Sequence, residues 1–367
     1  MYKKVKRVLS LLLACTIINT TIIEVVASEN KLNTNNFINS RVRDPNLIGQ
    51  VGIANTSDAI ANKLANEIVP NTVDDILETF PALEKALGTD KMETWLQLYN
   101  NPNSSVAASS MAVYRDSSLG AKPTSLQINV NTKDLRDEES IETGRTSDDL
   151  KSTIVHEIMH LIMQYTIPDV MDKNRGKQLP KWFYEGIAQV AGGGFSNKWN
   201  GWLINPSVGM QFDIWDGEDA VRKWTLYEDK YGAYAQGYLA VMYLGYKASD
   251  DKQISANSIA SGVNKILSSI IDGASFDESL IKNTGMSQKD IESLFGNQNR
   301  DPRIRELGQF AQKLSDIVLA RNDSKKGAGA VVGGDLKNTG GQIIKKEKFT
   351  TSPFYIGKVN IHGKVID

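Results

Sequence analysis

Apolar residues recur at helical spacing over several stretches of the chain. Between residues 57 and 83 they return every three or four positions, interrupted by Pro70 and Pro81. This spacing gathers them on one face of a helix, so it predicts amphipathic core helices in this part of the chain. The same spacing predicts further helices over residues 150–164, 182–192, 231–246, 256–271, 288–295 and 304–320.

A different period appears at residues 125–132, where apolar and polar residues alternate. Leu126, Ile128 and Val130 take every second position, which is the pattern of a strand with one buried face. A second apolar run lies at residues 111–115, and serine, glycine and proline residues separate the two runs. These turn-forming residues predict a β-hairpin.

The N-terminal segment combines basic residues with a short apolar stretch. The chain starts with MYKKVKR, and the stretch VLSLLLACTII that follows is too short to span a bilayer as a helix. We interpret residues 1–27 as an export signal that is cleaved after Ala27. Residues 28–58 are rich in Asn and Ser and are interpreted as a linker or a short pro-segment. The alternative is acylation of Cys15, which would hold the protein at the outside of a membrane.

The composition and length of the chain bear on disulfides, nucleic-acid binding, membrane spans and the number of subdomains. Cys15 is the only cysteine, so a chain without its signal has neither a thiol nor a disulfide. The 42 basic and 43 acidic residues nearly balance and give no electrostatic reason to expect a nucleic-acid partner. No segment after the signal is apolar enough to cross a membrane. The length of 367 residues predicts two or three packed subdomains.

The strongest chemical signal is the run HEIMH at residues 156–160. His156 and His160 lie four positions apart on a predicted helix, with Glu157 between them. Residues at this spacing share one helix face, so both imidazoles can bind one metal ion. Glu185, on the next predicted helix, completes a common ligand set for catalytic zinc. The alternative is a surface helix with incidental histidines, but the chain has only 3 histidines and places two of them here.

The residues around these ligands have predictable roles in hydrolysis. Zinc lowers the pKa of its bound water to about 7 and polarises a carbonyl, and Glu157 is the candidate general base. A tetrahedral intermediate also needs a donor for its oxyanion, and the tyrosines of residues 231–238 are candidates, with packing as their alternative role. Gln189 lies four positions after Glu185 and is a candidate for orienting a ligand histidine. The alternative is that Gln189 faces solvent.

These residues resemble the gluzincin branch of HExxH metallopeptidases. In that branch the third ligand is a glutamate on a second helix, often in an aromatic-rich E-G-x-A context, which matches WFYEGIA at residues 182–188. A downstream Tyr-x-x-Gly pattern matches residues 234–237, so the resemblance makes Tyr234 the preferred residue at the transition state. Residues 60–271 look most like flagellinolysin, a metallopeptidase domain inserted in some flagellins, through the segments FPAL, SLQINVN, VHEIMH, LPKWFYEGIAQ and YGAYAQGYLAVMYL. The export signal departs from that family, so a flagellar location is not implied.

The resemblance implies an α+β, zincin-like fold, in which a small mixed sheet and the motif helix lie over a mostly helical subdomain. We expect a metallopeptidase domain at residues 59–300, divided near residue 165, and a helix with a Gly- and Lys-rich extension at residues 301–367. Substrate would run through the cleft between the subdomains. An extended peptide would pair with residues 125–132 as the edge strand above the metal.

The sequence therefore predicts a secreted zinc endopeptidase with protein or peptide substrates, in contact with a membrane only if Cys15 is acylated. Two alternatives stay open: a secreted or surface-attached adhesin or structural protein with a non-catalytic metal site, and a hydrolase of cell-wall or glycoprotein peptides. Calcium is a further candidate ligand, although the spacing of the acidic stretch does not match an EF-hand loop and a solvated turn is the alternative. The acidic residues of that stretch are Asp213, Asp216, Glu218 and Asp219.

Overall fold

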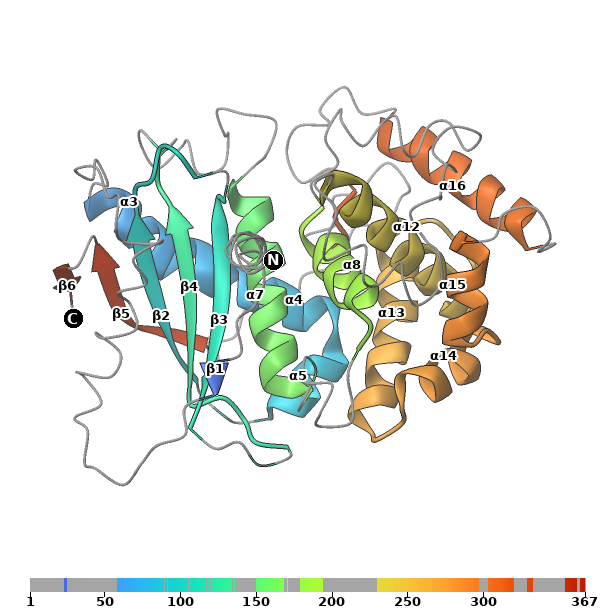
Figure 1. The fold of residues 1–367 in the computed structure, drawn as a ribbon, viewed down its shortest axis with the longest axis horizontal. Coiled ribbons are helices and arrows are strands. Elements are labelled where there is room, and N and C mark those ends of the chain that lie inside the picture. The colour runs from blue at the N-terminus through green and yellow to red at the C-terminus, as the bar shows by residue number, and fades with distance from the viewer. Residues whose placement is uncertain are drawn as a thin grey trace, which may run out of the picture.

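The computed structural model describes residues 23–24, most of 58–135, most of 150–193, and residues 230–296, 303–319, 329–332, 354–361 and 364–366. Within these residues the architecture is mixed α+β and mostly helical, as the sequence predicts, with a sheet at one end and a group of helices at the other (Figure 1). Helix α7 (Leu150–Thr166) lies between the two ends. None of the helices in the described part of the chain is long and apolar enough to cross a membrane.

The sheet contains six strands within the described residues, in the order β1-β3-β4-β2-β5-β6. Strands β3 and β4 pair antiparallel, which confirms the predicted hairpin, whereas β2 pairs parallel with both β4 and β5. The sheet is therefore mixed. The strands are β1 (Ile23–Glu24), β2 (Met92–Tyr99), β3 (Ala108–Tyr114), β4 (Ser125–Asn131), β5 (Phe354–Ile361) and β6 (Lys364–Ile366).

The prediction that residues 125–132 form an edge strand is wrong. Strand β4 lies inside the sheet, between β3 and β2. Trp95 and Leu96 lie on opposite faces of β2, and both are buried. A strand buried on both faces has no need of polar residues at every second position, and the sequence METWLQLY does not show a regular alternation. The pattern therefore does not predict this strand, which is the second neighbour of β4. The strand that borders the helical side is β3, where β1 pairs only with Val113 and Tyr114.

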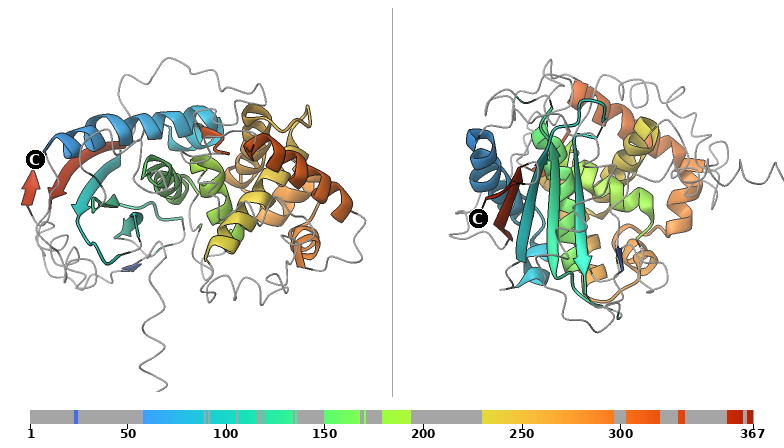
Figure 2. Two further views of the ribbon diagram at one scale, coloured as in Figure 1. Left: turned by 90° about the horizontal axis from the view of Figure 1, so that it is seen from above. Right: turned by 60° about the vertical axis from the view of Figure 1, so that its left-hand side comes forward.

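A series of short helices packs beside α7 on the sheet side of the molecule. These are α3 (Asp58–Lys63), the π-helical turn η1 (Leu64–Ile68), α4 (Val69–Thr79) and α5 (Pro81–Leu87). Pro81 takes the first position of α5, where its missing N–H and fixed φ suit a helix start. Figure 2 shows α7 on the concave side of the sheet with α4 close to it, and α7 contacts both α4 and β3. The motif helix is thereby held between the sheet and a helical layer.

The other end of the molecule consists of packed helices. Their bounds follow the sequence predictions to within a few residues, except for α14, which was not predicted. They are α8 (Lys181–Gly192), α12 (Lys230–Ala248), α13 (Ala256–Ile271), α14 (Phe276–Thr284), α15 (Gln288–Gly296) and α16 (Ile304–Leu319). Helix α14 begins with a capping box, in which Ser275 and Glu278 bond to each other's backbone N–H. Helix α8 lies between α7 and α12 and contacts both.

Glycines let these three helices approach closely. A Cβ atom on Gly186 of α8 would overlap the backbone of Gly237 in α12. A Cβ atom on Gly192 would lie 2.5 Å from the carbonyl oxygen of Ser152 in α7. Real Cβ atoms do not come so near to backbone atoms, so only glycine fits either crossing. These contacts set the position of α8 relative to α7.

Segments after residue 300 pack against both ends of the molecule. Helix α16 contacts α12, where Lys247 and Glu306 form an ion pair at 3.0 Å. The backbone N–H of Val331 donates to the carbonyl of Val190 at 3.0 Å, and β5 extends the sheet beside β2. Parts of the predicted C-terminal extension therefore belong to the packed structure around α8 and to the sheet.

Candidate metal centre

Helix α7 presents the two histidines toward α8. His156 and His160 are one turn apart, and their Nε2 atoms lie 3.1 Å from each other. Apolar residues surround them on α7, and Ile158 and Leu161 are buried in the main core cluster. The apolar face packs the helix into the molecule while the imidazoles meet at the boundary with α8. The sequence prediction that both rings face one point is confirmed.

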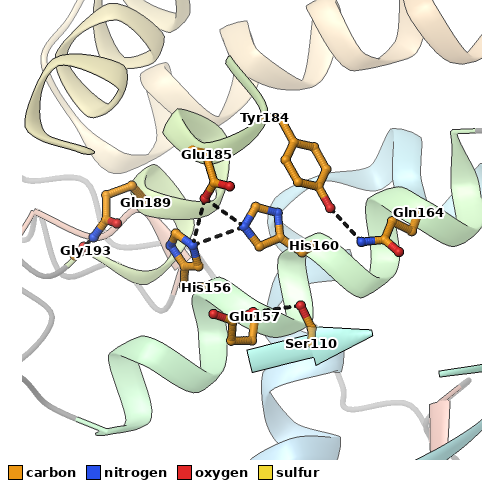
Figure 3. A network of polar contacts seen from close by, with 9 residues as sticks. All are labelled: Ser110, His156, Glu157, His160, Gln164, Tyr184, Glu185, Gln189 and Gly193. Atoms are coloured by element: carbon orange, nitrogen blue, oxygen red, sulfur yellow. Dashed lines mark hydrogen bonds and ion pairs between the residues drawn. The ribbon is translucent and has the colours of Figure 1, made fainter. Parts of the chain in front are cut away.

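Helix α8 brings the carboxylate of Glu185 to the same point. Its Oε2 atom lies 3.1 Å from Nε2 of His160 and 3.4 Å from Nε2 of His156 (Figure 3). In a tetrahedral zinc site, metal–ligand bonds of about 2.0–2.1 Å place any two ligand atoms about 3.3 Å apart. The three distances therefore match the ligand spacing of one zinc ion, and these residues form a group with metal-binding geometry.

Electrostatics keep Glu185 ionised. Burial by itself would raise the pKa of this carboxyl group, but the neighbouring His160 and His156 outweigh burial and hold the pKa well below its usual range. For His156 burial acts in the opposite direction and lowers the pKa of the imidazole. The hydrogen bond and charge of Glu185, together with the charge of Glu157, outweigh burial and raise this pKa overall. A negative carboxylate beside two imidazoles is a donor set that suits zinc and similar transition-metal ions.

The third residue of the motif, Glu157, lies on the sheet side of the histidines. Its Oε2 atom accepts a hydrogen bond of 2.7 Å from Oγ of Ser110 in β3 (Figure 3). The carboxyl group is half-buried, whereas His160 and Glu185 are buried. Nearby, burial and the charge of Glu157 raise the pKa of Tyr99 to about 12, so this tyrosine is neutral at physiological pH. Glu157 is thus held beside the ligands without taking part in their contacts.

The structure places Gln189 beside His156. The proximity of the Gln189 amide makes a small contribution to the raised pKa of the imidazole, after those of Glu185 and Glu157. The amide of Gln189 also donates to the carbonyl of Gly193, the residue that ends α8 with a positive φ of 75°. Gln189 therefore lies where a residue orienting a ligand histidine is expected, and that role stays a prediction.

His160 is held from another direction. Its ring stacks on Tyr184, with centroids 4.2 Å apart and an interplanar angle of 23°. The hydroxyl of Tyr184 accepts a hydrogen bond of 2.8 Å from Nε2 of Gln164, one turn after His160 on α7. His160 is 2% exposed, and the ring of Tyr184 covers one face of its imidazole.

Several sequence-predicted residues fall elsewhere. Tyr234 belongs to the helical backbone of α12, three positions before Gly237, but its side chain lies outside the described residues. Tyr238 is fully buried and donates to the carbonyl of Gly329 at 2.8 Å, which is a packing role. The candidate calcium ligands at residues 213–219 and the signal at residues 1–27, apart from β1, lie outside the described residues.

Three contacts of the site were not predicted from the sequence. Ser110, Tyr184 and Gln164 each touch a motif residue or its neighbour. Gln164 had a usable signal, since it lies four positions after His160 and therefore on the same helix face. Ser110 had none, because its contact depends on how β3 lies over α7.

Comparison of the chain with protein-family models, with curated proteins and with solved structures found no match in any of the three. The case for a function therefore comes from the site.

Proposed function

We propose that this chain is a secreted zinc-dependent endopeptidase with a zincin-like arrangement of its site. One observation carries the proposal: three ligand atoms from His156, His160 and Glu185 lie 3.1 to 3.4 Å apart, with an unligated glutamate beside them. A structural zinc site uses four protein ligands, whereas a catalytic site uses three and leaves a position open. Three ligands with an adjacent Glu157 therefore favour catalysis over a structural role.

Glu157 is the proposed general base. Zinc held by the three ligands would lower the pKa of water to about 7 and polarise the carbonyl of the scissile bond. Ser110 occupies one oxygen of Glu157, Oε2, and leaves Oε1 to accept the proton of the attacking water. Glu157 then passes this proton to the nitrogen of the leaving amine. Both transfers use a carboxylate whose position is set from β3.

The substrate is proposed to bind in extended form along β3. On the side of β3 away from β4, the described strands pair only with Val113 and Tyr114. Within the described residues no strand pairs with the backbone around Ser110 on this side, which suits pairing by an added strand, a recurring mode of peptide recognition. Because Ser110 also bonds to Glu157, a peptide paired there would pass the general base. Tyr234 stays our candidate donor to the oxyanion, on the strength of the gluzincin resemblance.

The test combines metal analysis with one substitution. Purified protein should contain one zinc per chain, and a zinc chelator should abolish its cleavage of an unstructured protein substrate. Glu157→Gln should keep the zinc and the fold and lower kcat by about 10²- to 10⁴-fold, because only the proton acceptor is removed. Full activity in the Glu157→Gln variant would exclude the proposed base. A wild-type chain without zinc would exclude the metal centre.

A further inference from the structure

Two buried polar atoms beside the ligands have no hydrogen-bond partner among the described residues. They are Nδ1 of His160 and Oε1 of Gln164. Both residues are on α7, four positions apart, so both side chains lie on the same face of the helix. Gln164 is 1% exposed and His160 is 2% exposed, which leaves no solvent to satisfy either atom. A donor-capable atom and an acceptor thus remain unpaired within one helical turn of each other.

The chemistry of a ligand histidine makes these atoms complementary. Nε2 of His160 points at Glu185 and His156, so this nitrogen is the one available to a metal. A neutral imidazole that binds metal through Nε2 carries its proton on Nδ1. That N–H group then needs an acceptor, because a buried donor left unpaired is costly. The carbonyl oxygen of a glutamine is such an acceptor.

Tyr184 contacts both the glutamine amide and the imidazole. Its hydroxyl accepts from Nε2 of Gln164 at 2.8 Å, and its ring stacks on His160 at 4.2 Å between centroids (Figure 3). The hydroxyl of Tyr114 donates to the backbone carbonyl of Gln164 at 3.3 Å. The amide is therefore tethered through its nitrogen while its oxygen stays free. Turning that oxygen toward Nδ1 requires a rotation of the side chain that changes its bond to Tyr184.

We infer that Gln164 is a positioning residue for zinc: its Oε1 accepts a hydrogen bond from the Nδ1–H group of His160 and fixes the tautomer and ring orientation that bind the metal. The inference rests on the proposed zinc site and adds to it a residue that orients His160. It also gives the two histidines similar surroundings, since Gln189 of α8 is among the groups that act on His156. Each ligand histidine then has one glutamine, supplied by α7 for His160 and by α8 for His156.

The experiment measures the zinc dissociation constant of the full-length protein by competition with a chromogenic chelator. Gln164→Met keeps the length of the side chain and removes the acceptor, and it should weaken zinc binding by about 10- to 100-fold. Gln164→Glu restores an acceptor oxygen and should bind zinc within a few-fold of wild type. Gln127→Met is the matched control, because Gln127 is a buried glutamine that bonds to Asn129 on β4 and should leave zinc affinity unchanged.

Thermal unfolding of the zinc-free variants separates a lost contact from a damaged fold. We expect the metal-free Gln164→Met protein to unfold cooperatively at a slightly lower temperature than wild type, because it also loses the buried bond to Tyr184. Equal zinc affinity in wild type and Gln164→Met would overturn the inference and leave the zinc site standing. Equal weakening by Gln164→Met and Gln164→Glu would overturn the acceptor role. A wild-type protein that binds no zinc would overturn the proposed function itself, and the inference with it.

Discussion

The two helices that carry the proposed ligands are held in different ways. Helix α7, on the sheet side, carries both histidines and Glu157, and β3 reaches it through the side-chain bond from Ser110. Helix α8, on the helical side, carries Glu185 and contacts its neighbours through glycines, with backbone against backbone at Gly186. On the sheet side, the contact from β3 therefore orients one side chain, that of Glu157. On the helical side, the glycine contacts determine the position of the whole helix α8.

The two distances within the site have different structural origins. The separation of the histidines follows from the helical repeat and needs no tertiary contact. The distance to Glu185 depends on how closely α8 approaches α7, and a metal site tolerates errors of only about 0.2 Å in its ligand distances. Changes at the helix crossings should therefore affect metal binding and folding together. Changes at β3 should affect catalysis alone.

The largest effect is expected from Gly186→Ala. The new Cβ atom would meet Gly237 and, at 2.8 Å, the side chain of Val241, so α8 must move away from α12. Overpacking of this kind costs about 1–3 kcal/mol of folding free energy, and the shift of Glu185 should weaken zinc binding in parallel. Urea unfolding and chelator competition measure the two losses.

A second glycine provides the control for that experiment. Gly285 ends α14 in the left-handed conformation, at φ 73° and ψ 12°, with no atom within 4 Å of an added Cβ. Gly285→Ala should cost about 1 kcal/mol through backbone strain alone and leave zinc affinity unchanged. If Gly186→Ala also kept full zinc affinity, the crossing of α8 and α12 would not position Glu185.

A smaller effect, confined to catalysis, is expected from Ser110→Ala on the sheet side. The substitution frees Oε2 of Glu157 and lets the carboxylate rotate away from the attacking water. Loss of one hydrogen bond to a charged group, worth about 1.4 kcal/mol in the transition state, should lower kcat by about tenfold. Steady-state kinetics should show little change in KM, and zinc affinity should stay at the wild-type level.

Ser109 tests whether this effect belongs to the Ser110 contact. It is the preceding residue of β3, and its hydroxyl accepts from Nδ2 of Asn129 at 3.2 Å. Adjacent strand residues point to opposite faces, so Ser109→Ala leaves Glu157 untouched and should keep kcat unchanged. Equal losses in the two variants would attribute the change to the strand and remove Ser110 from the positioning of Glu157.

The same contrast explains how much the sequence predicts. Helices with a regular apolar spacing, such as α13 (Ala256–Ile271), begin and end where the pattern indicates. The candidate ligands His156 and His160 are also readable, because their separation follows from spacing within α7. These are local features, and local physics is enough to predict them. Glu185 is readable only as the third member of a known ligand set, and its distance from the histidines is not.

What could not be predicted depends on contacts between distant segments. Strand β2 is buried on both faces and has no alternation, and β5 pairs with it from more than two hundred residues away in the chain. The sequence predicts an edge position for β4 because it does not predict β2, the strand that pairs with β4 on the side away from β3. The partners Ser110 and Tyr184 are unremarkable in sequence. They acquire their roles only where β3 and α8 meet α7.

The smallest effect is expected at a surface contact of the helical side. Asp290 near the start of α15 accepts from the hydroxyl and backbone N–H of Ser287 and from Arg303, and these bonds lower its pKa from 3.8 to about 2. Its side chain is 38% exposed, so solvent screening should reduce the contribution to below about 1 kcal/mol. A depressed pKa in the folded state stabilises the protein above the unfolded pKa, and that stabilisation is lost as the pH falls through the folded value.

Asp290→Asn should therefore be slightly less stable than wild type at pH 7, and the difference should shrink as the pH falls from about 4 to about 2. Urea unfolding of both proteins across this range gives the measurement. Zinc affinity at pH 7 should be the same in both, because α15 does not supply a ligand. A stability difference that stayed constant down to pH 2 would mean that the carboxylate charge is not what Ser287 and Arg303 stabilise. A loss of zinc affinity would mean that surface contacts between α15 and α16 also position α8, which would extend control of Glu185 beyond the glycine crossings.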